Sequence, residues 1–156
     1  MKLKQKLKNL LPPEELTLLV GSYDVIGDLA IIVIPDELRH RERLIGETIM
    51  NINSRINVVL RRAGNYRGEF RQISLSVICG EKRKETVTSE HGVILKINPE
   101  LVYYSVRSSS ERKRIASLIK KREKVLVMFS GAGPYPLVIS KHSPAEVIWG
   151  IEKNPS

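Results

Sequence analysis

A glycine turn followed by an acid is the feature of this sequence best suited to bind a small molecule. Gly131-Ala132-Gly133 comes directly after the apolar run 124–130, and Glu152, nineteen residues after Gly133, ends the next apolar run. Glycine lets backbone N–H groups approach a ligand closely, and an acid at this spacing can accept hydrogen bonds from the two hydroxyls of a ribose. The pattern predicts a nucleoside-binding site.

The third position of the turn motif decides which nucleosides suit it. Dinucleotide-binding turns carry a third glycine there, which allows the helix to pack tightly, but this sequence has Pro136. A pyrophosphate ligand, and with it a dehydrogenase, is therefore disfavoured. The commonest nucleoside ligand without a pyrophosphate is S-adenosyl-L-methionine, which becomes the predicted cofactor. An ordinary tight turn beside a solvated glutamate is the alternative.

The elements that would position these residues form a β-α-β unit. Hydrophobic spacing predicts a helix at 110–121, a buried strand at 124–130, a helix at 135–141 and a second, parallel strand at 146–151. The first hundred residues differ in pattern and indicate a mixed α+β unit with an antiparallel sheet. Its expected elements are helices at 3–11 and 37–52, a hairpin with a glycine-aspartate turn at 23–35, and strands at 58–60, 73–79 and 86–97.

Composition points to a polyanionic partner. The chain has 156 residues, a net charge of +9 and a pI near 9.8, which favours nucleic acid over an anionic membrane surface. Cys79 is the single cysteine, and no apolar run approaches the roughly 18 residues of a membrane span. The amino terminus lacks the apolar segment of a signal peptide, so we expect a cytoplasmic protein. The three histidines are scattered, and no metal site is expected.

Six stretches, in order along the chain, carry a family resemblance: SYDVIGDLAII, RGEFR, ETVTSEHGV, VYYSVRSSSERKRIA, VLVMFSGAGPY and IEKNP. Together they resemble the archaeal and eukaryotic methyltransferases that modify guanine 37 of tRNA, which share a fold with the wybutosine-pathway aminocarboxypropyl transferases. The resemblance implies an α+β amino-terminal domain that recognises tRNA (residues 1–100), followed by the start of an α/β Rossmann-like class I methyltransferase domain (residues 101–156). It also implies S-adenosyl-L-methionine as cofactor, tRNA as partner and a monomer.

Within this resemblance, the methyltransferase branch fits better than the aminocarboxypropyl branch. The chain keeps four residues typical of the methyltransferases, namely Arg107, Pro134, Tyr135 and Asn154. It departs from their pattern at Val106, where proline is usual, and at Val127, where aspartate is common. Methyl transfer to N1 of guanine 37 is the predicted reaction. Aminocarboxypropyl transfer to tRNA, or a catalytically silent tRNA-binding module, are the alternatives.

The resemblance also assigns roles to individual residues. Arg107 is the expected catalytic residue, because a guanidinium can stabilise the negative charge that develops on O6 when N1 loses its proton. The expected cofactor-binding residues are Arg112, Phe129, Gly131, Gly133, Glu152 and Lys153. For Arg107 the alternative is a phosphate contact or a surface charge. For Arg112 it is a position on a solvated helix face.

Two clusters of basic residues, one of them around Tyr66 and Phe70, indicate an RNA surface, since cations bind phosphates and aromatic rings stack on bases. The predicted RNA-binding residues are Arg61, Arg62, Arg67, Arg71, Lys113 and Arg114. Simple solvation of many of these charges is the alternative. Family members continue beyond the second parallel strand with further strands, so we expect the 156-residue chain to hold an incomplete cofactor domain and to be inactive alone.

Overall fold

The computed structural model describes residues 2–156, with the side chain of Tyr66 outside the described part, and it divides into two compact units. The first unit comprises residues 2–66 and 73–86. The second comprises Arg67–Gln72 and Val87–Ser156. The sequence placed the boundary at residue 100, whereas the structure places it between residues 86 and 87. In the described residues no helix is both long and apolar enough to span a membrane.

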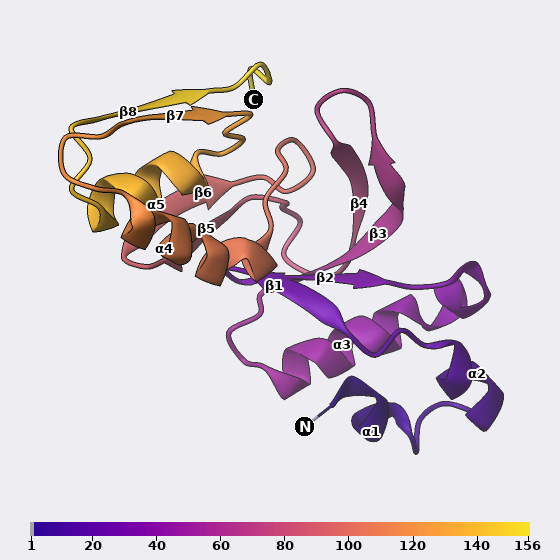
Figure 1. The fold of residues 1–156 in the computed structure, drawn as a ribbon. Helices are drawn as coiled ribbons and strands as arrows, with labels where there is room; N and C mark the ends of the chain where they lie inside the picture. The colour runs from indigo at the N-terminus through magenta and orange to yellow at the C-terminus, as the bar shows by residue number, and fades with distance from the viewer. Residues whose placement is uncertain (1) are drawn as a thin grey trace. The chain divides into compact units, whose positions relative to one another are not determined.

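The first unit is built on a four-stranded sheet of order β1-β2-β3-β4 (Figure 1). Its elements are α1 (Leu3–Leu7), α2 (Pro13–Leu18), β1 (Tyr23–Ile26), β2 (Leu29–Val33), η1 (Asp36–Arg41), α3 (Glu42–Ile52), β3 (Val58–Arg67) and β4 (Gln72–Gly80). The predicted hairpin is confirmed: β1 and β2 pair antiparallel around Gly27, whose φ of 56° suits glycine. In contrast, β2 and β3 are parallel, because α3 carries the chain back before β3 begins. The sheet is therefore mixed: the expected antiparallel pairing is present in the β1–β2 hairpin, and a parallel pair between β2 and β3 accompanies it.

Alternation along the strands of the first unit gives its sheet two apolar faces. Ala30, Ile32 and Val59 point to one face, where they join buried residues of α1, η1 and α3. Leu29, Val58 and Leu60 point to the other face and pack with Ile73 and Leu75 of β4. One helix was not predicted from the sequence: α2 begins at Pro13. Proline suits the first turn of a helix, where its missing N–H costs nothing.

The second unit contains the predicted β-α-β arrangement. Its elements are β5 (Thr86–Glu90), which begins at the boundary residue, β6 (Val93–Ile97), η2 (Val106–Ser108), α4 (Ser109–Leu118), β7 (Lys124–Met128), α5 (Pro134–His142) and β8 (Val147–Ile151). Strands β7 and β8 are parallel, with Leu126 opposite Trp149 and Met128 opposite Ile151. Helix α5, which connects them, packs against α4 and against the β5–β6 hairpin (Figure 1).

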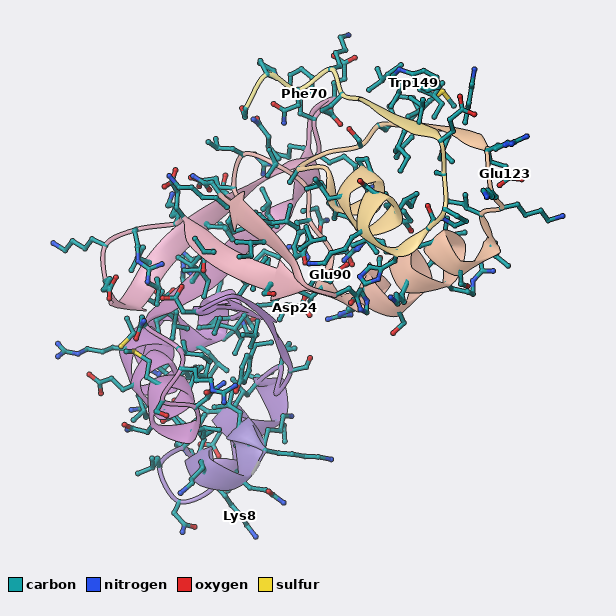
Figure 2. The ribbon with its side chains drawn as sticks, turned by 90° about the vertical axis from the view of Figure 1, so that its left-hand side faces the viewer. Lys8, Asp24, Phe70, Glu90, Glu123 and Trp149 are labelled. Carbon is teal, nitrogen blue, oxygen red and sulfur yellow. The ribbon has the colours of Figure 1, made fainter. Side chains whose placement is uncertain are left out.

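Only one face of the β7–β8 sheet is covered. We expected β7 to be a buried strand, but Leu126, Met128, Trp149 and Ile151 are each half exposed or more. Figure 2 shows Trp149 on the side of β8 that faces away from α5. The expectation was wrong because α5 shields a single side of a two-stranded sheet, whereas the strands of a parallel sheet are normally covered on both.

A hydrogen-bond network around the carboxylate of Asp28 links distant segments of the first unit. Asp28 lies in the hairpin turn and accepts hydrogen bonds from Arg83 Nη1 (3.0 Å), Thr86 Oγ1 (2.7 Å) and Asn57 Nδ2 (2.9 Å), and it also pairs with Arg83 Nη2. Its backbone N–H donates to Thr86 Oγ1 in return. The Arg83 guanidinium, with smaller contributions from Thr86 and Asn57, holds the pKa of Asp28 well below its usual range. The network ties the β1–β2 turn to the end of the unit.

Replacing this carboxylate should destabilise the first unit. We expect Asp28→Asn to lower the free energy of unfolding by about 2 kcal/mol, the usual size for hydrogen bonds to a charged group. Because the folded-state pKa of Asp28 is depressed, the advantage of the wild type should be complete above about pH 4 and should shrink as the pH falls further. Urea unfolding followed by circular dichroism at several pH values measures both effects.

The matched control is Asp36→Asn, because the Asp36 side chain is 88% exposed and its ion pair with Arg39 spans 3.5 Å. That change should alter the free energy of unfolding by less than about 0.5 kcal/mol. Equal effects of the two substitutions would show that the Asp28 network contributes nothing special.

Candidate functional site

The second unit contains a cavity of about 430 Å³ at the carboxyl ends of β7 and β8. Four of the six residues predicted to bind a cofactor line it: Arg112, Phe129, Gly131 and Glu152. Gly133 and Lys153 are close in sequence but are not lining residues. The remaining lining residues come from the segments before and after these elements, namely Glu69, Phe70, Arg71, Val102, Tyr103, Tyr104, Ser105, Ser108, Ser130, Pro134, Tyr135 and Asn154.

The glycine turn has the backbone conformation that its sequence predicts. Gly131 and Gly133 have φ values of 55° and 79°, in the left-handed region that other residues rarely adopt. A Cβ added at Gly131 would lie 3.2 Å from the carbonyl oxygen of Tyr103. Phe129 shares the left-handed conformation, with a φ of 57°, although it has a side chain. Such strain is typical of ligand sites.

Glu152 is held by the backbone of the same turn. Its Oε2 accepts a hydrogen bond from the N–H of Gly131 (2.7 Å), and its Oε1 accepts from the N–H groups of Lys153 (2.9 Å) and Asn154 (2.8 Å). These hydrogen bonds, led by those from Asn154 and Gly131, lower the pKa of Glu152. The lowered pKa keeps Glu152 ionised. A carboxylate offers about four acceptor positions, so one remains for a ligand hydroxyl beside the three backbone donors.

Arg112 reaches the cavity from α4 and is only 2% exposed, so the solvated helix face we considered for it is excluded. Its Nε and Nη2 donate to the two carboxylate oxygens of Glu90, both at 2.5 Å, and Nη2 also donates to the carbonyl of Ser105 at 2.9 Å. Within the described part of the chain, Nη1 donates no hydrogen bond. Since Arg112 lines the cavity, Nη1 is the donor that a ligand could meet there.

Glu90 is a site residue that sequence reasoning missed. It lies 7% exposed at the end of β5 (labelled in Figure 2). It also accepts a hydrogen bond from the Tyr104 hydroxyl at 2.9 Å. Burial raises the pKa of Glu90, but the hydrogen bonds from Arg112 and Tyr104 outweigh burial and the net shift is downward. Burial and the bond to Glu90 raise the pKa of Tyr104 to about 12. A usable signal existed: Glu90 lies on the same, inward side of its strand as buried Thr86, where a lone acid requires a cation.

The segment Arg67–Gln72 supplies one wall of the cavity. Lys153 Nζ lies 2.6 Å from Glu69 Oε1, and the Arg71 guanidinium lies 4.6 Å from the centre of the Tyr103 ring. Arg71 was predicted only as an RNA contact, so its place at the cavity is new. Lys153 was predicted to lie beside a cofactor, but its ammonium group forms this ion pair with Glu69.

Arg107, the predicted catalytic residue, lies beside the cavity but does not line it. It is exposed on η2, between Ser105 and Ser108, which are both lining residues. Arg107 is therefore close in sequence to Arg112 and to the residues that line the cavity. Its side chain is exposed to solvent.

The residues predicted to bind RNA separate into two groups. Arg61 is 9% exposed, and its Nε lies 2.7 Å from Glu42 Oε1 without the alignment of a hydrogen bond. This buried ion pair argues against a contact between Arg61 and RNA. The other five are exposed or partly exposed: Arg62, Arg67, Arg71, Lys113 and Arg114. Two of these have neighbours on the second unit's helices, since Arg114 pairs with Glu111 and Lys113 Nζ lies 2.6 Å from His142 Nδ1.

Comparison with known families finds two matches that together cover nearly the whole chain. Residues 3–83 match the TYW2 N-terminal domain, and residues 86–156 match the TRM5/TYW2 methyltransferase domain. The junction between the two matches agrees with the boundary between the structural units after residue 86.

Individual relatives give the same picture. The chain is 35% identical over 144 residues to tRNA (guanine(37)-N(1))-methyltransferase Trm5b of Pyrococcus abyssi, covering 92% of this chain and 43% of the relative. A solved complex of aTrm5 with tRNALeu superposes with a TM-score of 0.87 at 32% identity, over 99% of this chain and 46% of that one. TYW2 of Pyrococcus horikoshii in complex with MeSAdo gives a TM-score of 0.71 at 29% identity, over 98% and 53%. The chain therefore spans about half the length of these relatives.

The geometry of the turn yields a test with a built-in control. Gly131→Ala and Gly68→Ala both place a side chain at a positive φ, which costs roughly 1–2 kcal/mol. A Cβ at Gly68 (φ 68°) meets nothing within 4 Å, whereas at Gly131 it meets the Tyr103 carbonyl. We expect Gly131→Ala to lower the free energy of unfolding more than Gly68→Ala, measured by urea unfolding with the fluorescence of Trp149, the chain's only tryptophan. Equal losses would show that the turn tolerates crowding at residue 131.

Proposed function

Because the chain belongs to the family that joins a TYW2 N-terminal domain to a TRM5/TYW2 methyltransferase domain, we propose that it serves the S-adenosyl-L-methionine-dependent methylation of tRNA at N1 of guanine 37. The observation that carries the proposal is the cavity at the carboxyl ends of β7 and β8, where the glycine turn and Glu152 meet. Ligands of α/β folds bind at this end of the strands.

The cavity residues fit the proposed cofactor. Its volume of about 430 Å³ lies in the range of small-molecule sites, and aromatic side chains line it. Glu152 Oε2 keeps one acceptor position for a ribose hydroxyl, and Arg112 Nη1 can donate to the carboxylate of an amino-acid group. Phe129 and Gly131 would border the methionine end, with Gly133 holding the turn. Lys153 would reach the adenosine only if it left Glu69.

When bound, the cofactor supplies a methyl group made electrophilic by its sulfonium. The chain's own contribution to the reaction is charge stabilisation at the target base. As N1 of guanine loses its proton, negative charge develops on O6, and the Arg107 guanidinium is permanently cationic with donors in one plane. Its exposed place on η2, next to the cavity wall, suits contact with a base held by a large RNA.

The tRNA itself would be bound through exposed cations. The candidates are Arg62, Arg67, Arg71, Lys113 and Arg114, in a chain of net charge +9. Electrostatic contacts of this kind bind phosphates without reading sequence, and they weaken as salt rises. We place the protein in the cytoplasm as a monomer, in line with its single cysteine and its tRNA substrate.

Two other functions have an observation in their favour. The likeness to a solved TYW2 favours aminocarboxypropyl transfer from the same cofactor, in the same cavity. The uncovered face of the β7–β8 sheet, in a chain about half as long as its relatives, favours a tRNA-binding module that does no chemistry alone. The two enzymatic functions leave different groups on tRNA, and the binding module leaves the tRNA unmodified.

A product analysis separates all three functions. The chain would be mixed with the part of the Pyrococcus abyssi relative that it does not match, together with labelled cofactor and a transcript carrying guanine 37. We expect a single methyl group at that base, found by mass spectrometry, and little turnover by the 156-residue chain alone. A transferred aminocarboxypropyl group would identify the second function. Salt-sensitive tRNA binding without cofactor binding would identify the third, and methylation of a transcript lacking guanine 37 would contradict the proposed target.

The role of Arg107 can be tested against a second arginine. In the same mixture, Arg107→Ala should lower the rate of methyl transfer by on the order of 100-fold with a small change in tRNA affinity, because its charge partner exists mainly in the transition state. Arg114→Ala, at an exposed position paired with Glu111, should weaken tRNA binding modestly and leave the rate at saturating tRNA unchanged. Parallel losses of rate and affinity in the Arg107 variant would instead assign Arg107 to a phosphate contact.

A further inference from the structure

The charged groups around the cavity balance one another, although the chain as a whole has a net charge of +9. Four charged residues line the cavity: Glu69, Arg71, Arg112 and Glu152. Two of them have partners of opposite charge that do not line it, because Lys153 pairs with Glu69 and Glu90 pairs with Arg112. The remaining two, Arg71 and Glu152, are opposite in sign. The cavity is therefore neutral in a strongly basic protein.

The two ion pairs differ greatly in how much their charges are screened. The side chains of Lys153 and Glu69 are 72% and 65% exposed, so water weakens their field. The side chains of Arg112 and Glu90 are 2% and 5% exposed, so their charges act at a low effective dielectric. Glu90 is consequently the group that decides whether the cavity wall is cationic or neutral.

Hydrogen bonding explains why Glu90 can neutralise Arg112 without taking its place in the cavity. The carboxylate of Glu90, which does not line the cavity, accepts from Nε and Nη2, and among the described residues Nη1 has no hydrogen-bond partner. Tyr104 completes the shell of Glu90, and the Tyr135 ring lies 5.7 Å from the guanidinium. Arg112 can thus offer an N–H donor at Nη1 while the Glu90 carboxylate neutralises its positive charge.

On this basis, and resting on the proposed function, we propose that Glu90 sets the charge selectivity of the cavity: by neutralising Arg112 it admits a cationic sulfonium ligand. An unpaired Arg112 would repel the sulfonium of S-adenosylmethionine and would not repel the uncharged thioether of S-adenosylhomocysteine. Glu90 itself touches no ligand and acts through Arg112. The observable is the ratio of the affinities for these two ligands, which differ by one methyl group and one positive charge.

Three variants of the 156-residue chain test this at pH 8 by NMR titration, which measures weak dissociation constants. Glu90→Gln leaves a net positive charge, and it should shift the affinity ratio against S-adenosylmethionine by on the order of tenfold. Arg112→Gln leaves a net negative charge and should shift the ratio in the opposite direction. The double variant is neutral again and should return to the wild-type ratio, even though both ligands bind it more weakly because the Nη1 donor is lost.

Opposite shifts in the two single variants support the proposal, because a purely structural role of the ion pair would weaken both ligands alike. If a single variant does not fold, as judged by circular dichroism, the other one and the double variant still give the sign of the shift. An unchanged ratio in every folded variant overturns the role of Glu90 while leaving the proposed function intact. Failure of the wild-type chain to bind either ligand at millimolar concentration counts against the cofactor site itself, and the inference falls with it.

Discussion

The buried ion pair between Glu90 and Arg112 is the interaction on which the second unit depends. It joins the end of β5 to α4, and through Tyr104 and the Ser105 carbonyl it also fixes the segment that leads into η2. Two charges at this depth are costly to desolvate, so each requires the other, and removal of one partner leaves an uncompensated charge. The ion pair thereby fixes the position of α4 at the cavity wall, because α4 cannot move without breaking the two charge-assisted hydrogen bonds between Arg112 and Glu90.

The groups expected to bind a ligand also hold the backbone around the cavity in place. Glu152 binds the Gly131 N–H and closes the loop after β7, so the acid that would hold a ribose also holds the glycine turn in place. Asn154, from the same carboxyl-terminal segment, donates to the carbonyl of Leu101 at 2.8 Å. The site is preorganised because its polar groups have backbone partners before any ligand arrives. It follows that binding need order few side chains, which favours affinity.

Local patterns were sufficient to predict much of this molecule. The hairpin at Gly27, the β7-α5-β8 unit, and the placement of Arg112, Phe129, Gly131 and Glu152 at one cavity all follow from short-range spacing. Long-range pairings could not be read in the same way. The parallel β2–β3 contact depends on how α3 returns the chain, and the burial of Arg61 depends on Glu42, nineteen residues away. Glu90 and Glu69 acquire their roles from partners that only the folded chain brings near them.

The assignment of Arg67–Gln72 to the second unit changes what counts as its cofactor domain. This segment lies between β3 and β4 in the sequence, yet Glu69, Phe70 and Arg71 line the cavity. A shorter polypeptide cut at the family boundary, from residue 86 onward, would retain Arg112 and Glu152 while losing a whole wall of the cavity and the partner of Lys153. Domain dissection guided by contiguous sequence would thus leave the site open on the side of this segment. The cavity is thus discontinuous in sequence, because its walls are encoded by two separate stretches of the gene.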